Sequence, residues 1–184
     1  ARIRTYRTNG VLAKPVDLSK NQLIQTMAME GIVVTHADAL GINIDWNYLE
    51  HLKTRPGFPD SKPFLTHLYE GTPTIDLDDS FMKLALYPGI LDIVNAYLQM
   101  HASWYYFSLN RTSISTNAPS DSQRWHRDPE DRRVVKMFLY LTDIDKQAGP
   151  FMYVKKSARG LRYGRLFPQK PPIGYYPPDG KVEW

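Results

Sequence analysis

The fold prediction for this chain rests first on the stretch Val134-Val135-Lys136-Met137-Phe138-Leu139-Tyr140-Leu141. β-Branched and aromatic residues fill it, and these residues favour strands. Side chains alternate between the two faces of a strand. The odd-numbered positions are purely apolar and predict a face packed in a core, whereas the even-numbered positions mix a lysine with aromatic residues. The pattern predicts a strand over 133–141.

The segments around this stretch predict α+β organisation with a mainly β core. Pro150 to Val154 is expected to form the next strand after a turn at 145–149, and the aromatic run 103–109 the preceding one. Helices are expected from Asp17 or Ser19 to about Met29, over 45–52 and from Pro88 to Leu98. A short strand is expected at 32–35, and loops at 54–74, 118–121 and 168–178. Helices followed by strands favour a β sandwich or jelly roll, with a helical part over 1–101 and a β core over 102–184 of one domain.

Composition restricts the classes of protein to which the chain can belong. Its 184 residues are 42% hydrophobic and 23% charged, as in one soluble globular domain. No cysteine is present, which excludes disulfides, zinc–thiolate sites and cysteine nucleophiles. With no signal-like or membrane-spanning run, a cytoplasmic protein is expected. The net charge of +4 is scattered, apart from a cluster over 155–165, so neither nucleic acid nor membrane is the expected partner.

The tripeptide His126-Arg127-Asp128 is the motif that carries chemistry. On a strand, side chains at i and i+2 point to one face, so the imidazole and the carboxylate would converge. Such a pair is two thirds of the 2-His-1-carboxylate site of non-haem Fe(II) oxygenases. The alternatives are a surface histidine beside an aspartate in a turn, or the His-Arg-Asp of a protein kinase. The kinase interpretation fails, because Arg133 stands where a kinase has Asn, and neither Asp-Phe-Gly nor a Gly-rich phosphate loop is present.

The segment from Arg124 to Val154 resembles the phytanoyl-CoA dioxygenase family. The resemblance is carried by His126 to Asp131, by Val134 to Asp145 and by Ala148-Gly149-Pro150-Phe151-Met152-Tyr153-Val154. It implies an Fe(II)- and 2-oxoglutarate-dependent oxygenase on a double-stranded β-helix (a cupin-like jelly roll), with His126 and Asp128 as iron ligands. The implied reaction uses O2, and its outcome is hydroxylation of a small molecule.

Five further residues are candidates for binding the co-substrate 2-oxoglutarate. Lys136 or Tyr140 could bind its carboxylate, and Phe138 could pack against it, if their strand face looks into the pocket. Asn110 and Arg111 end the preceding strand and could also approach the co-substrate. The alternative for Lys136 and for Arg111 is a charge exposed to solvent.

The chain departs from the family pattern in two places. Lys155-Lys156-Ser157-Ala158 stands where members usually have Pro-Gly-Ser-His, and no histidine follows His126 to serve as the distal ligand, nor is there the arginine that follows that ligand. A chain incomplete at its C-terminal side is expected; a non-catalytic jelly-roll binding module is the alternative. The arginines that flank the motif either bind an anionic substrate at the entrance of the site (an anion-binding mouth) or form solvent-exposed ion pairs. They are Arg124, Arg127, Arg132 and Arg133. The substrate and the oligomeric state stay open at this point.

Overall fold

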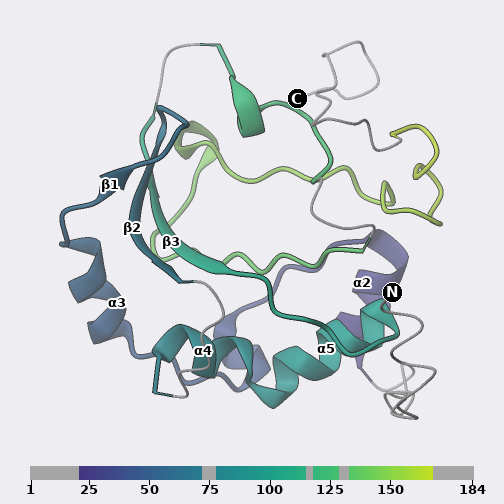
Figure 1. Cartoon of the computed structure of the whole chain (residues 1–184). Helices are drawn as coiled ribbons and strands as arrows, with labels where there is room; N and C mark the ends of the chain where they lie inside the picture. The colour runs from purple at the N-terminus through teal and green to yellow at the C-terminus, as the bar shows by residue number, and fades with distance from the viewer. Residues whose placement is uncertain (1–20, 72–77, 115–117, 129–132, 168–184) are drawn as a thin grey trace. The chain divides into compact units, whose positions relative to one another are not determined.

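The computed structural model describes residues 21–71, 78–114, 118–128 and 133–167. The chain divides into two compact units (Figure 1). Unit 1 comprises residues 1–44 and 75–105, and unit 2 comprises residues 45–74 and 106–184. The motif His126-Arg127-Asp128 therefore belongs to unit 2.

Unit 1 is helical among its described residues, and its helices begin and end at residues suited to caps. The Asn21 side chain accepts hydrogen bonds from the backbone N–H groups of Leu23 and Ile24, at 2.9 and 3.2 Å. At the other end of the same helix, Gly31 has φ 78°, a left-handed conformation that favours glycine, and its N–H donates to Met27. The elements are α2 (Gln22–Glu30), η2 (Ala37–Leu40), α4 (Ser80–Ala85) and α5 (Pro88–Leu98).

The core of unit 1 forms where α2 packs against α5. Its buried side chains are Ile24, Met82, Ile90 and Leu98. Burying a side chain of this size contributes about 1.5–3 kcal/mol. These apolar contacts, together with the caps, account for the helical order of the unit.

Unit 2 is built on a three-stranded antiparallel sheet with strand order β1-β2-β3. Figure 1 shows β2 and β3 as long curved strands lying side by side, with β1 at the edge. Phe58 pairs with His67, and His67 pairs with Asn110, so these three residues form a row across the sheet. The elements are α3 (Trp46–Lys53), β1 (Phe58–Pro59), β2 (Leu65–Gly71), β3 (Phe107–Thr112), η3 (Asp121–Gln123) and η4 (Lys146–Ala148).

The core of unit 2 lies where α3 packs against β2. Asp45 caps α3 by accepting from the N–H of Tyr48 at 3.0 Å. Gly57 precedes β1, and a Cβ there would come within 2.3 Å of the Thr66 methyl group, so only glycine allows this close approach of the two strands. The buried apolar side chains of the unit are Leu49, Leu52, Phe64, Leu68 and Phe167.

Several sequence-based predictions are confirmed. The structure is α+β, α5 occupies the predicted range, α3 is shifted by one residue from the predicted 45–52, and α2 ends one residue beyond Met29. The predicted caps Asp17 and Ser19 lie outside the described residues, and the observed cap of α2 is Asn21. The predicted loop at 168–178 also lies outside them. The segment 118–121 is irregular up to the start of η3, and η4 lies within the predicted turn at 145–149.

Other predictions are wrong. The predicted loop 54–74 contains β1 and β2, and the strand predicted at 103–109 begins only at Phe107. The segments 32–35, 133–141 and 150–154 were predicted as strands and have no strand assignment. Sequence pattern predicts an extended backbone, but a strand also needs the ladder of hydrogen bonds to a neighbour.

Segments 133–141 and 150–154 nevertheless lie beside each other. The Phe138 and Phe151 rings stack with their centroids 4.6 Å apart, and the Tyr140 hydroxyl accepts a hydrogen bond from the N–H of Phe151 at 3.0 Å. Met137, predicted to lie in the core, is 49% exposed. Side-chain contacts, rather than a backbone ladder, connect these two segments. Among the described residues, no helix has both the length and the apolar character needed to span a membrane.

Candidate metal centre

His126 and Asp128 face each other across the motif in unit 2. His126 Nε2 lies 3.6 Å from Asp128 Oδ1. This separation is too long for a hydrogen bond and is an ion-pair contact when the ring is protonated. The convergence predicted from the i, i+2 spacing is thus present, although the motif follows η3 and lies outside the sheet β1-β2-β3.

The other ring nitrogen of His126 is held by the backbone. His126 Nδ1 lies 2.6 Å from the carbonyl oxygen of Arg124, so Nδ1–H donates to that oxygen. In the neutral ring this bond keeps the proton on Nδ1 and leaves the lone pair on Nε2, the nitrogen that faces Asp128. Metal-binding histidines are oriented in this same way by a carbonyl or carboxylate on the other ring nitrogen.

Lys136 is the third charged group of the cluster. Its Nζ lies 2.9 Å from Asp128 Oδ1, the same oxygen that faces His126. The three side chains are partly exposed, at 22% for His126, 37% for Asp128 and 31% for Lys136. The stretch 134–141 therefore contributes a cation to the motif.

The charges of this cluster shift the pKa values of its members in opposite directions. The Asp128 carboxylate raises the pKa of His126 above 6.5, helped by the Arg124 carbonyl and opposed by burial and by Lys136. His126 and Lys136 together lower the pKa of Asp128 to about 2, against the effect of burial. Asp128 is thus ionised at every ordinary pH, and a proton on Nε2 of His126 competes with any metal ion for that nitrogen.

The donor set fits two positions of a metal site. Metal–nitrogen and metal–carboxylate bonds of about 2.0–2.2 Å allow one ion to bridge two atoms up to about 4 Å apart, and 3.6 Å lies within that reach. Within the described parts of the chain, no group of three His, Asp or Glu side chains could hold a metal ion. Among the described residues, the structure therefore shows a facing imidazole and carboxylate and no third side chain of this kind beside them.

The remaining predicted site residues lie in different surroundings. Phe138 and Tyr140 contact Phe151, and both are about half exposed. Arg111 is exposed on β3 and pairs in register with Thr66. Asn110, two residues from Ser108 on the same strand, takes part in a separate polar network.

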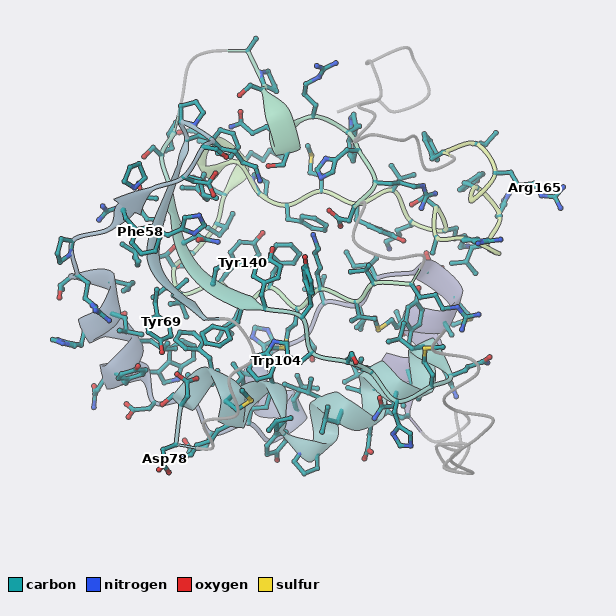
Figure 2. The ribbon with its side chains drawn as sticks, viewed as in Figure 1. Phe58, Tyr69, Asp78, Trp104, Tyr140 and Arg165 are labelled. Carbon is teal, nitrogen blue, oxygen red and sulfur yellow. The ribbon has the colours of Figure 1, made fainter. Side chains whose placement is uncertain are left out.

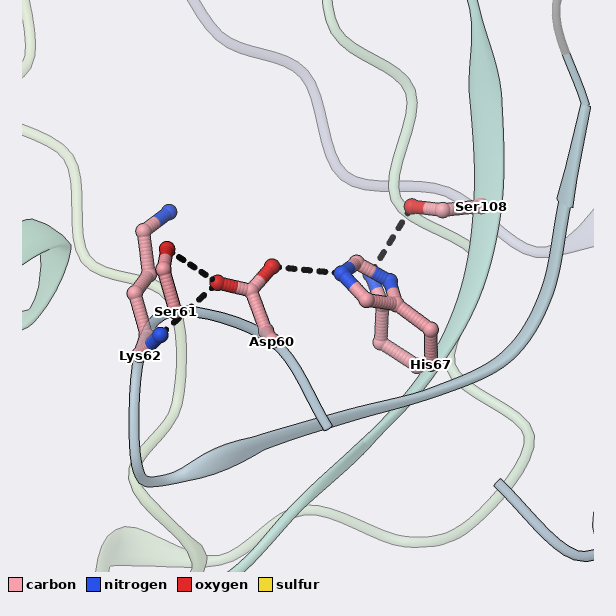
Figure 3. A network of polar contacts seen from close by, with 6 residues as sticks. Asp60, Ser61, Lys62, His67 and Ser108 are labelled. Atoms are coloured by element: carbon pink, nitrogen blue, oxygen red, sulfur yellow. Dashed lines mark hydrogen bonds and ion pairs between the residues drawn. The ribbon is translucent and has the colours of Figure 1, made fainter. Parts of the chain in front are cut away.

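Sequence reasoning missed this network, which joins β2 and β3 to the turn that follows β1 (Figure 3). His67 Nε2 lies 2.5 Å from Asp60 Oδ2, and His67 Nδ1 lies 2.7 Å from Asn110 Oδ1. Asn110 Nδ2 in turn donates to the hydroxyl of Ser108 at 2.8 Å. Because residues 54–74 were predicted to be a loop, His67 was not expected to face a neighbouring strand. The β-favouring run Leu65 to Tyr69 was nevertheless a signal for a strand.

Asp60 anchors one end of this network. Its Oδ1 accepts from the N–H of Lys62 and from the hydroxyl of Ser61, both at 2.8 Å. These bonds, first that of Lys62 and then that of Ser61, lower the pKa of Asp60 from 3.8 to about 2, with a further contribution from His67. Hydrogen bonding to the charged form outweighs the opposing effect of burial.

We expect the Asp60 network to make the stability of the protein acid-sensitive. Because the folded-state pKa is depressed, its contribution is fully present above 3.8 and is lost as the pH falls towards about 2. In Asp60→Asn, the free energy of unfolding should fall less steeply over that interval than in the wild type. Urea titrations across this pH range measure the effect, with Asp38→Asn in unit 1 as the control. Equal slopes in wild type and Asp60→Asn would contradict it.

Arg127, the central residue of the motif, contacts two distant backbone carbonyls. Its Nε donates to the carbonyl of Phe167, and a terminal nitrogen donates to the carbonyl of Ser157. Both acceptor residues are buried. Neither role considered for the flanking arginines, an anion-binding mouth or solvated ion pairs, describes this side chain.

The chain was compared with known proteins, and no relative was found. The chain matches no family model, no curated protein and no solved structure. The resemblance of residues 124–154 to the phytanoyl-CoA dioxygenase family therefore stays a prediction from the sequence.

Proposed function

We propose that the chain belongs to an Fe(II)- and 2-oxoglutarate-dependent oxygenase that hydroxylates a small molecule. The observation that carries this proposal is the bond from His126 Nδ1 to the Arg124 carbonyl, which directs the Nε2 lone pair towards Asp128. A neutral imidazole and an ionised carboxylate, both partly exposed, are the donors that non-haem Fe(II) takes. The proposal includes a jelly-roll fold, to which the sheet β1-β2-β3 would belong, and a cytoplasmic location.

The residues of this chain would have distinct roles. His126 and Asp128 would hold Fe(II), and the third protein ligand would come from outside the described residues. Bound iron with 2-oxoglutarate supplies activation of O2. Lys136, in contact with Asp128, offers positive charge to the carboxylates of 2-oxoglutarate, and the exposed rings of Phe138 and Tyr140 offer apolar surface beside it.

Metal and co-substrate binding test this proposal directly. Anaerobic protein titrated with Fe(II) and then with 2-oxoglutarate should develop the weak visible charge-transfer band of a chelated 2-oxoacid. The band should require both additions and should be absent when succinate, which cannot chelate through a 2-oxo group, replaces 2-oxoglutarate. Absence of the band in the protein after both additions would refute the proposal.

The affinity for metal should increase with pH. A metal ion must displace the proton from Nε2 of His126, whose pKa is raised by Asp128. Asp128 stays ionised over the whole range, since its pKa is about 2. Calorimetric titration with Mn(II) should therefore show affinity that rises through the His126 titration and then levels off, and a flat profile would contradict this assignment of ligands.

A second candidate function is a non-catalytic binding module. The observation that favours it is the ion pair between Lys136 and Asp128, which neutralises the carboxylate without any metal. If Lys136 serves only as that counter-ion, Lys136→Met should remove one charge partner of the carboxylate and destabilise the protein, without any metal-dependent property to lose. If the oxygenase proposal holds, Lys136→Met should instead weaken binding of 2-oxoglutarate to the Fe(II)-loaded protein.

A further inference from the structure

Arg127 holds two separated parts of unit 2 together. Its two acceptors, the carbonyls of Ser157 and Phe167, lie 30 and 40 residues along the chain from it. They are the two ends of the segment 157–167, which consists mainly of turns. One planar guanidinium can donate to two acceptors at once, in a fixed fork that an ammonium group cannot reproduce.

The segment between these two carbonyls is ordered by its own hydrogen bonds. The N–H of Leu161 donates to Ala158, that of Gly164 to Leu161 and that of Leu166 to Tyr163, all at 3.0 Å. Burial of Ser157 and Phe167 fixes the two ends. Arg127 is therefore anchored on a defined backbone rather than on a solvated surface.

Arg127 also lies between the two proposed iron ligands in the sequence, so fixing its side chain restricts the backbone on both sides. That backbone sets how His126 Nδ1 meets the Arg124 carbonyl at 2.6 Å, and how Asp128 Oδ1 is placed against Nε2. The structure thus assigns to Arg127 the role of a positioning residue: its fork onto Ser157 and Phe167 sets the orientation and tautomer of His126. This inference rests on the proposed function only for its consequence on metal affinity.

The imidazole 15N spectrum of His126 tests the inference without any metal. Spectra are recorded above the titration range of the ring in the wild-type chain and in Arg127→Gln, Arg127→Lys and Arg165→Gln. The wild-type spectrum should show the signals of a protonated Nδ1 and an unprotonated Nε2. Arg127→Gln should move both signals towards the average of the two tautomers, because the hydrogen bond to Arg124 is no longer enforced.

The two other variants control for charge and for folding. Arg165 lies in the same segment and its side chain is exposed and points away from the ribbon (Figure 2), so Arg165→Gln removes the same charge and should leave the spectrum unchanged. Arg127→Lys keeps the charge, which protects the fold, but its N–H donors sit on one nitrogen and cannot reproduce the two separate nitrogens that meet the two carbonyls. It should therefore show the same tautomer shift as Arg127→Gln, to a smaller extent.

Co(II) titration gives the second readout. Residues that orient a metal ligand typically change metal affinity by about 10–100-fold when replaced, and Arg127→Gln and Arg127→Lys should both lose about 10-fold while Arg165→Gln loses none. Unchanged 15N signals in both Arg127 variants would overturn the inference, as would a shift that Arg165→Gln reproduces. Failure of the wild type to bind Co(II) would overturn the oxygenase proposal alone, since the 15N result decides the positioning role by itself.

Discussion

Replacing His126 by alanine should abolish metal binding and turnover while leaving the protein folded. Replacing a residue that only orients a metal ligand lowers metal affinity by about 10–100-fold. Replacing the ligand itself should lower metal affinity by more than that. His126 is partly exposed and its contact with Asp128 is a surface ion pair, so the loss of stability should be at most about 1 kcal/mol. Mn(II) calorimetry and urea unfolding of the same sample measure the two effects separately.

A matched control is available on α3 of the same unit. His51 is exposed there, and His51→Ala should bind metal as the wild type does. Asp128→Asn keeps the shape of the side chain but removes its charge, and it should lose metal binding as His126→Ala does. Metal affinity retained in His126→Ala, or lost equally in His51→Ala, would place the site elsewhere.

Leu52→Ala should strongly destabilise the protein, because Leu52 is the most buried apolar side chain among the described residues of unit 2. Leu52 is 2% exposed on the face of α3 that packs against β2. Truncating a fully buried leucine removes apolar burial and leaves a cavity, which together cost about 2–5 kcal/mol. The free energy of unfolding, measured by urea titration with an unchanged slope, reports this cost.

Leu166→Ala is the control for this experiment. Leu166 is 55% exposed, so the same chemical change there should cost no more than about 0.5 kcal/mol. Equal losses in the two variants would mean that the packing of α3 on β2 does not limit the stability of unit 2. A smaller cost for Leu52→Ala than for Leu166→Ala would contradict the described core.

The predictions that succeeded depended on local chemistry. Asp45 before α3 and Pro88 at the start of α5 mark helix ends that the structure confirms, because a cap or a proline acts within one turn of the chain. The i, i+2 spacing of His126 and Asp128 likewise predicted that their side chains would face each other. The role of this pair in metal binding stays a prediction.

The predictions that failed concerned long-range pairing. Residues 133–141 have strong strand composition, yet β2 formed instead in a segment predicted as a loop, where β1 and β3 provide partners. β-Propensity measures how a residue fits a paired, half-buried surface, so composition alone does not identify the strands that find partners. His67 and its network were missed for this reason.

The sequence by itself determined the starts of α3 and α5, the α+β class and the facing pair of the motif, since each depends on residues within a few positions of one another. Only the tertiary structure decided that Lys136 contacts Asp128, that Asp60 and Asn110 bind opposite nitrogens of His67, and that Arg127 anchors on the ends of 157–167. Those contacts join side chains and carbonyls that are up to 43 residues apart. The folded backbone brings these groups within reach of each other, and no periodicity of the sequence encodes such distances.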